Sequence, residues 1–146
     1  MPHVVKSTIL NAPTGAVWDL LRDFNGYDRW HPAVATSTIE RAQPSDKIGC
    51  IRRLRLSDGS ELREHLLALS DLEQTCSYCL LDTPIPLFNY AAHVRLLPIT
   101  DGDRTFWHWE SRFTTKPEDH ERLTQMVSQE IYQAGFDAIR RHLRAA

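Results

Sequence analysis

The segment IGCIRRLRLSDGSELREHLLAL, residues 48–69, joins two runs of alternating apolar and polar residues through a turn sequence. Alternation of this kind predicts two β-strands that form a hairpin. The two apolar rows share one face of the sheet only if the loop has three residues, 58–60, because a one-residue slip would turn every side chain to the other face. In that register Arg52 and Glu64 also lie on the apolar, inward face.

The sequence on both sides of this hairpin predicts more strands and two helical regions. Strands are expected at 3–10, 34–40, 75–82, 89–98 and from about 104 onward, a capped helix at 11–24, a helical turn at 27–32, a proline-rich loop at 83–88 and one long helix at about 118–144. One curved sheet and one long helix cannot close a dry two-layer core of full width. The predicted fold is therefore α+β, with an antiparallel sheet of about seven strands that wraps around the C-terminal helix and leaves a cavity.

The stretch FWHWES, residues 106–111, also alternates and leaves open which of its two faces is buried. One face carries Trp107 and Trp109, and the other carries His108 and Glu110. Burying the tryptophans would simply fill a core. Burying a histidine and a glutamate would instead indicate a polar-lined cavity for a ligand.

Length and composition predict one globular domain, residues 1–146, in the cytoplasm. The net charge of −2 gives no basic surface for nucleic acid, and no apolar run approaches the roughly 18 residues of a membrane span. Three cysteines argue against a disulfide framework. Cys76 and Cys79 lie three apart on a predicted strand and so point to opposite faces, and we expect no metal and no cofactor.

A spaced pattern runs through essentially the whole chain: VWDLLRDFNGYDRWHP at 17–32, GCIRRLRLSDGSELREHLLALSD at 49–71, PIPLFNY at 84–90, WES at 109–111 and YQAGFDAI at 132–139. In this pattern the chain resembles the START-like, or SRPBCC, superfamily, and most nearly its bacterial polyketide cyclase/dehydrase-type proteins. The abscisic acid receptors and the birch-pollen-allergen family are more distant relatives. The resemblance implies a helix-grip fold with a ligand cavity between the sheet and the C-terminal helix.

The resemblance also implies which positions line the cavity. The receptors' pocket positions correspond here to Leu54, Leu56, Leu62, Glu64, Tyr78, Leu80, Tyr90, Ala92 and Glu110. This places Glu110 and His108 toward the cavity. Trp107 and Trp109 then lie on the outer face, where they could form a homodimer surface. A β-bulge could instead turn Trp109 inward. The receptors' gating loops correspond to SDGS and TPIPLF. The SDGS loop is shorter than its counterpart in the receptors, and TPIPLF has prolines where the receptors have a different latch. The lysine in the receptors' pocket has no counterpart in this sequence. Abscisic acid sensing is therefore not expected.

The C-terminal helix and the segment before the second strand should add further contacts. Helical spacing places one set of side chains toward the sheet: Ser128, Ile131, Tyr132, Gly135 and Ile139. Gly135 is costly inside a helix, and either a close approach to the sheet or a ligand, or mere tolerance, would explain it. Trp30 is expected near the end of the cavity, and the tyrosines could serve either a ligand or a packed core.

Four ionisable groups would then face one apolar cavity: Arg52, Glu64, His108 and Glu110. The preferred function is binding, as a carrier or sensor, of a small hydrophobic molecule such as a lipid, polyketide or aromatic metabolite, with these groups orienting its polar end. The alternative is a polyketide cyclase/dehydratase-like enzyme, with Glu64 or Glu110 as base and Tyr90 or His108 as acid. A buried ionic network that only stabilises the fold is a third interpretation.

Overall fold

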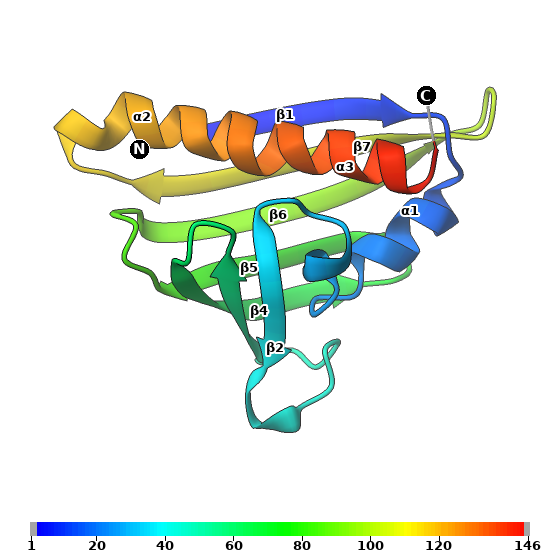
Figure 1. The fold of residues 1–146 in the computed structure, drawn as a ribbon. Helices are drawn as coiled ribbons and strands as arrows, with labels where there is room; N and C mark the ends of the chain where they lie inside the picture. The colour runs from blue at the N-terminus through cyan, green and yellow to red at the C-terminus, as the bar shows by residue number, and fades with distance from the viewer. Residues whose placement is uncertain (1–2, 145–146) are drawn as a thin grey trace.

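Seven antiparallel strands form one curved sheet in the computed structural model, which describes residues 3–144 (Figure 1). The strands lie in the order β1-β7-β6-β5-β4-β3-β2, so β1 and β2 are the two edges. Their bounds are β1 His3–Leu10, β2 Val34–Ile39, β3 Ile51–Leu56, β4 Glu61–Ser70, β5 Thr75–Asp82, β6 Phe88–Ile99 and β7 Arg104–Thr114. The predicted α+β helix-grip fold is confirmed.

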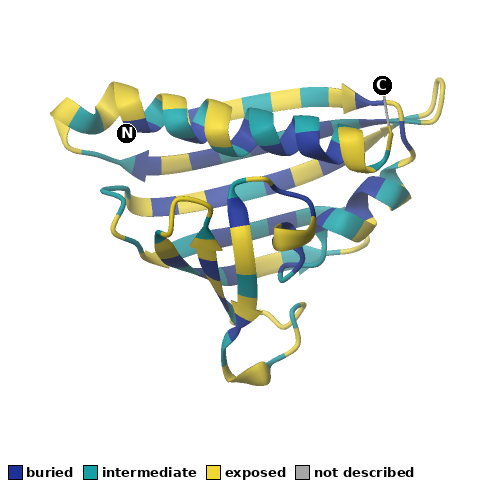
Figure 2. Cartoon of the chain, viewed as in Figure 1, coloured by how far each residue is buried: buried dark blue, intermediate teal, exposed yellow. Residues whose placement is uncertain are grey.

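The helices lie on one side of this sheet (Figure 1). Two short elements, α1 Thr14–Leu21 and the turn η1 Tyr27–Arg29, follow β1, and the turn η2 Glu40–Ala42 follows β2. The long C-terminal helix consists of η3 Pro117–Asp119, α2 His120–Gln125, the π-helical segment η4 Met126–Gln133, and α3 Ala134–His142. In Figure 2 its buried residues alternate along the helix with exposed residues, as expected of an amphipathic helix packed on a sheet. Within residues 3–144 no helix is long and apolar enough to cross a membrane.

The hairpin of β3 and β4 has the predicted three-residue loop, but in a different place. Leu54 lies opposite Leu62, so the loop consists of residues 57–59 rather than 58–60. Gly59 then becomes the third loop residue, and its φ of +91° is the left-handed conformation that such loops require at that position. The correction moves the pairing by two residues, which leaves every side chain on its predicted face.

The sequence prediction was wrong about which face of β7 is buried. Trp107 and Trp109 are 0% and 1% exposed, whereas the side chains of His108 and Glu110 are each 28% exposed on the outer face. Trp109 lies opposite the buried Val94 of β6, and directly opposite residues share a face. Each tryptophan can remove roughly 150–250 Å² from water, while burying a histidine and a glutamate would cost free energy of desolvation. The two tryptophans therefore belong to the core and cannot form the predicted homodimer surface.

Gly135 allows the C-terminal helix to lie directly on the sheet. A Cβ at this position would be 2.8 Å from Cζ3 of Trp109 and 3.3 Å from the ring of His31. Close approach to the sheet thus explains a residue that costs about 1 kcal/mol inside a helix.

The π-helical segment changes the spacing of the buried residues on this helix. Val127 and Tyr132 are both buried although they are five residues apart, where a regular α-helix brings residues three or four apart to one face. Ser128, which α-helical spacing predicted to face the sheet, is consequently turned to the side and only partly buried.

Candidate functional site

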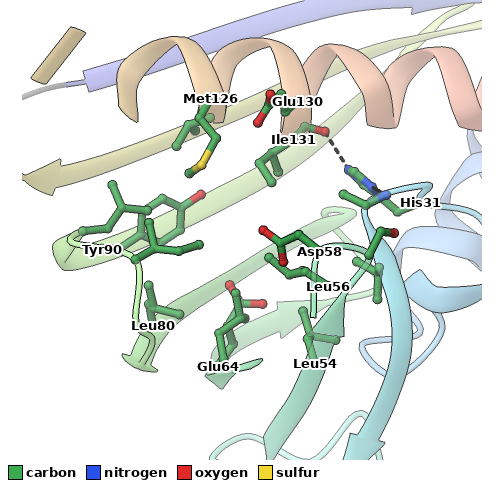
Figure 3. A pocket seen from close by; sticks show the side chains of 17 residues that line it. His31, Leu54, Leu56, Asp58, Glu64, Leu80, Tyr90, Met126, Glu130 and Ile131 are labelled. Carbon is green, nitrogen blue, oxygen red and sulfur yellow. Dashed lines mark hydrogen bonds between the residues drawn. The ribbon is translucent and has the colours of Figure 1, made fainter. Parts of the chain in front are cut away.

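A pocket of about 290 Å³ lies between the curved sheet and the C-terminal helix (Figure 3). Most of the lining is apolar, contributed by Ala33, Val34, Leu54, Leu56, Leu62, Leu80, Ile85, Leu87, Met126, Val127 and Ile131. The polar lining residues are His31, Ser57, Asp58, Glu64, Tyr90 and Glu130. A mainly apolar cavity with a few polar groups has the usual composition of a small-molecule site.

Two loops flank the pocket on the sheet side. The β3–β4 loop contributes Ser57 and Asp58, and the β5–β6 loop contributes Ile85 and Leu87. These loops fall within the segments SDGS and TPIPLF, residues 57–60 and 83–88.

Arg52 and Glu64 form a buried ion pair on the inner face of the hairpin. The two residues lie directly opposite each other on β3 and β4. The Arg52 guanidinium donates from Nε at 2.9 Å and from Nη2 at 2.7 Å, both to Oε1 of Glu64. Its Nη1 donates to the carbonyl oxygen of Phe24 at 2.9 Å. Burial acts to lower the pKa of Arg52, but Glu64, Tyr27 and Tyr78 together raise it by more, so the pKa is raised.

Aromatic rings enclose the same guanidinium. The Arg52 Cζ lies 4.0 Å from the ring centroid of Phe24, 4.2 Å from that of Tyr27 and 4.8 Å from that of Tyr78. Cation–π attraction strengthens when the cation is removed from water, as it is here. Arg52 therefore lies behind the pocket wall, within the core, and does not line the cavity.

Glu64 is the residue that connects this ion pair to the cavity. It is 7% exposed, and its carboxylate extends into the pocket near Leu54 and Leu80 (Figure 3). Arg52 engages only Oε1, and Oε2 has no hydrogen-bond partner within residues 3–144. One oxygen of a buried carboxylate is thus free to accept a hydrogen bond from a molecule in the pocket.

His31 closes the pocket on the side of the C-terminal helix (Figure 3). Its Nδ1 accepts a hydrogen bond from the Ala33 backbone N–H at 3.1 Å, so its Nε2 must carry the proton and donate to the Ile131 carbonyl at 2.7 Å. The side chain is 3% exposed, and burial lowers its pKa. His31 is therefore a neutral ring that ties the loop before β2 to the π-helical segment.

The Tyr90 side chain lines the pocket, and its hydroxyl lies 3.2 Å from the Tyr132 hydroxyl. Burial raises the pKa of Tyr90 to about 12. Behind it, Trp109 Nε1 donates to the Tyr78 hydroxyl at 3.2 Å. The tyrosines thus form a buried polar layer in which Tyr90 lines the cavity and the others support the core.

Comparison with known proteins agrees with this architecture. The family model described as "Polyketide cyclase / dehydrase and lipid transport" matches residues 1–144. The chain belongs to this polyketide cyclase/dehydrase and lipid transport family. No curated protein matches it.

Solved structures similar to this family member share its fold over nearly their whole length. A Thermobifida fusca protein is 27% identical, with 99% of this chain and 95% of that chain covered and a TM-score of 0.85. The protein XoxI from Bacillus cereus is 24% identical, with 97% and 95% covered and a TM-score of 0.86. The Zhui aromatase/cyclase from a Streptomyces species is 19% identical, with 97% and 95% covered and a TM-score of 0.77.

In this polyketide cyclase/dehydrase-type chain, the predicted contact residues fall into three groups. Those that line the pocket are Leu54, Leu56, Leu62, Glu64, Leu80, Tyr90 and Ile131. Those buried in the core but absent from the pocket lining are Trp30, Arg52, Tyr78, Ala92, Tyr132 and Gly135. Ser128, His108 and Glu110 lie outside both groups.

His108 and Glu110, predicted to face the cavity, belong to a polar cluster on the outer face of the sheet. Glu110 contacts His3 Nε2 at 2.7 Å through Oε2 and His108 Nε2 at 3.4 Å through Oε1. The hydrogen bond from His3 lowers the pKa of Glu110. The catalytic roles considered for Glu110 and His108 are therefore incompatible with this pocket, which lies on the opposite side of the sheet.

The cysteines and other potential ligands form no metal centre within residues 3–144. Cys50, Cys76 and Cys79 are free thiols. Cys76 is buried on the inner face and Cys79 is partly exposed, so the pair points to opposite faces of β5 as predicted.

Several pocket residues were missed by the sequence reasoning. His31 stands in an irregular segment where no periodicity marks a buried side chain. Val127 and Met126 belong to the helix turn before Ile131, and a four-residue step back from Ile131 would have found Val127. Asp58 and Ile85 lie in the two loops already singled out, although no individual side chain was chosen there.

Proposed function

We propose that this protein binds a small, mainly apolar molecule that carries a hydrogen-bond donor, and that it acts as a carrier or sensor. One observation carries the proposal: Oε2 of Glu64 is directed into a mainly apolar cavity and has no hydrogen-bond partner within residues 3–144. A carboxylate oxygen accepts hydrogen bonds, and this one is open to whatever occupies the pocket. A donor group on a ligand can therefore bind to it.

The cavity favours a compact ligand over a long-chain lipid. Its volume of about 290 Å³ is at the lower end of the roughly 300–1,000 Å³ that small-molecule sites span. An aromatic metabolite or a short alkyl chain fits that space, with its apolar part against Leu54, Leu62 and Ile131.

The hydrogen bonds around the pocket support binding rather than acid–base chemistry. Both ring nitrogens of His31 are already engaged, one as acceptor and one as donor. The pKa of Tyr90 is raised to about 12, which makes its hydroxyl a poor proton donor near neutrality. His31 thus has no free nitrogen for a ligand, and the Tyr90 hydroxyl can hydrogen-bond a polar ligand atom without exchanging a proton with it.

Two adjacent leucines of β5 provide a matched test. Leu80 lines the pocket, whereas Leu81 is 44% exposed on the opposite face. With the neutral fluorescent probe N-phenylnaphthylamine, Leu80→Trp should weaken binding at least about tenfold because the indole occupies the cavity, while Leu81→Trp should leave it unchanged. Equal effects of both substitutions, or no probe binding by the wild-type protein, would refute the proposal. Native mass spectrometry of protein purified from cells should also show a bound small molecule.

A catalytic role is the second candidate, because Glu64 and Tyr90 line the same pocket and a protein of the same fold is an aromatase/cyclase. In that case Glu64 would remove a proton from a carbon next to a carbonyl that Tyr90 hydrogen-bonds. Incubation with polyketide substrates distinguishes the two functions. Loss of turnover in Glu64→Gln with retained binding identifies an enzyme, whereas a change in affinity alone identifies a carrier or sensor.

A further inference from the structure

The charged residues that line the pocket all have the same sign. Asp58 comes from the β3–β4 loop, Glu64 from β4 and Glu130 from the C-terminal helix, and no lysine or arginine lines the cavity. The one basic residue in the lining, His31, is buried, and burial lowers its pKa. Within residues 3–144, Asp58 and Glu130 therefore line the pocket without a lysine or arginine in the lining to balance them.

The arginines near the pocket are each paired with an acid. Arg52 pairs with Glu64 from the core side through Oε1 and balances its charge, so the unbalanced charge of the lining belongs to Asp58 and Glu130. Arg122, one turn before Met126 on the helix, forms an ion pair with Asp119 at 2.9 Å. Arg55, on the hairpin, forms one with Glu61 at 3.0 Å.

The two carboxylates at the mouth are both available to a ligand. Asp58 Oδ1 accepts from the Ser60 hydroxyl at 2.6 Å and from its backbone N–H at 2.9 Å, and these bonds lower the pKa of Asp58. Glu130 is exposed and has no ion-pair or hydrogen-bond partner within residues 3–144. Figure 3 shows one carboxylate at the helix and the other across from it, next to Leu56.

From this arrangement we infer that the pocket selects an amphiphile that ends in an ammonium group over one that ends in a carboxylate. The inference rests on the proposed function and specifies its ligand class. An ammonium group can donate to Oε2 of Glu64 and is attracted by the two mouth carboxylates. A ligand carboxylate would be repelled by Asp58 and Glu130 and could not donate a hydrogen bond to Oε2 of Glu64. A hydroxyl can donate to Glu64 but gains nothing from the charge at the mouth.

Three ligands with the same alkyl chain test this inference: octylamine, octanol and octanoate. Each is titrated against bound N-phenylnaphthylamine at about pH 7.5, where the amine is protonated and the acid is ionised. Octylamine should displace the probe at a concentration about tenfold lower than octanol does. Octanoate should be the weakest competitor of the three. The advantage of octylamine over octanol should shrink as salt is added, because exposed carboxylates are screened.

A charge-matched pair of double variants identifies the source of the preference. Asp58→Asn with Glu130→Gln removes the two mouth charges and should reduce the amine-to-alcohol ratio several-fold. Asp101→Asn with Glu73→Gln removes two exposed acids in the turns at the other ends of β6 and β4, away from the two loops that flank the pocket, and should leave the ratio unchanged. Octanoate binding as tightly as octylamine, or equal ratios in the two double variants, would overturn the inference while leaving the proposed function intact. If the probe itself does not bind, the proposed function fails and the inference fails with it.

Discussion

The guanidinium of Arg52 places two of its hydrogen bonds on a single oxygen of Glu64, Oε1, at 2.9 and 2.7 Å. The pairing of β3 with β4 sets this geometry, because it brings the two residues opposite each other on the inner face. One ion pair thus neutralises a charge that the core could not otherwise hold, and it leaves the second oxygen for the cavity. The stability of the core and the proposed binding of a ligand therefore both involve this carboxylate.

Arg52→Met should be strongly destabilising. It leaves the Glu64 carboxylate buried without a counter-charge, and loss of one partner from a buried ion pair typically costs about 3–5 kcal/mol. Adding Glu64→Leu should recover much of that loss, since the unpaired charge is then removed as well. Urea unfolding followed by circular dichroism measures both changes.

The control for this prediction is Arg55→Met on the same strand. Arg55 pairs with Glu61 on the exposed side of the hairpin, and such pairs contribute about 0–1 kcal/mol. A loss in Arg52→Met no larger than the loss in Arg55→Met would contradict the assigned role of the buried pair.

Two helical glycines should respond in opposite directions to alanine. Gly135→Ala places a methyl group 2.8 Å from the Trp109 ring, and overpacking of this kind costs about 1–3 kcal/mol. Gly15, in α1, has no neighbouring atom within 4 Å of such a methyl group, so Gly15→Ala should stabilise the protein by roughly 0.5–1 kcal/mol. Thermal unfolding of the two variants should show shifts of opposite sign; a higher midpoint for Gly135→Ala would disprove the close contact.

The fold was largely predictable because most of its elements have strong local signals. The alternating runs and the turn residues of the hairpin determine two strands and their faces, and an error in the pairing by two residues does not alter those faces. The faces of β7 were harder to assign, because apolar and polar side chains alternate there and Phe106 adds an apolar residue to the polar row. The pairing of Trp109 with Val94 decides which face of β7 is buried, and that pairing is a contact between strands that the alternation within β7 does not reveal.

Trp107→Ala tests the corrected orientation of β7. Trp107 is fully buried and packs against Phe136 with ring centroids 4.6 Å apart. Truncating a buried tryptophan costs about 3–5 kcal/mol, whereas His108→Ala on the outer face should cost less than about 1 kcal/mol. Urea unfolding measures the free energy of unfolding of both variants. Comparable losses would contradict the buried position of Trp107 and support the orientation of β7 predicted from the sequence.

The pocket was less predictable than the fold, for two physical reasons. The π-helical segment shifts which helix residues face inward, and the five-residue step from Val127 to Tyr132 has no signature in an α-helical pattern. Irregular segments such as the one that contains His31 have no periodicity, so their inward side chains are set only by tertiary contacts. The rows of leucines on β3, β4 and β5 were predictable because strands impose a strict alternation.

Acid should weaken the link that His31 makes between the loop before β2 and the C-terminal helix. Burial lowers the pKa of His31 from its ordinary value of 6.5, with a smaller contribution from the charge of Arg52. The unfolded chain therefore takes up this proton at a higher pH than the folded chain does, so folding stability is lost as the pH falls below 6.5. A proton on Nδ1 would also face the Ala33 N–H and remove the hydrogen bond that Nδ1 accepts there.

His31→Gln isolates this contribution, because glutamine can still donate to the Ile131 carbonyl but does not titrate. Urea unfolding at about pH 7.5 and about pH 5 should show a larger loss of stability in the wild-type protein than in His31→Gln. The other titratable groups are the same in both proteins and contribute equally to both, including His93, whose pKa burial also lowers. His142→Gln, at an exposed position of α3, should keep the wild-type pH dependence. If His31→Gln and the wild-type protein lose the same stability over this interval, His31 is not the neutral, buried group that its two hydrogen bonds require.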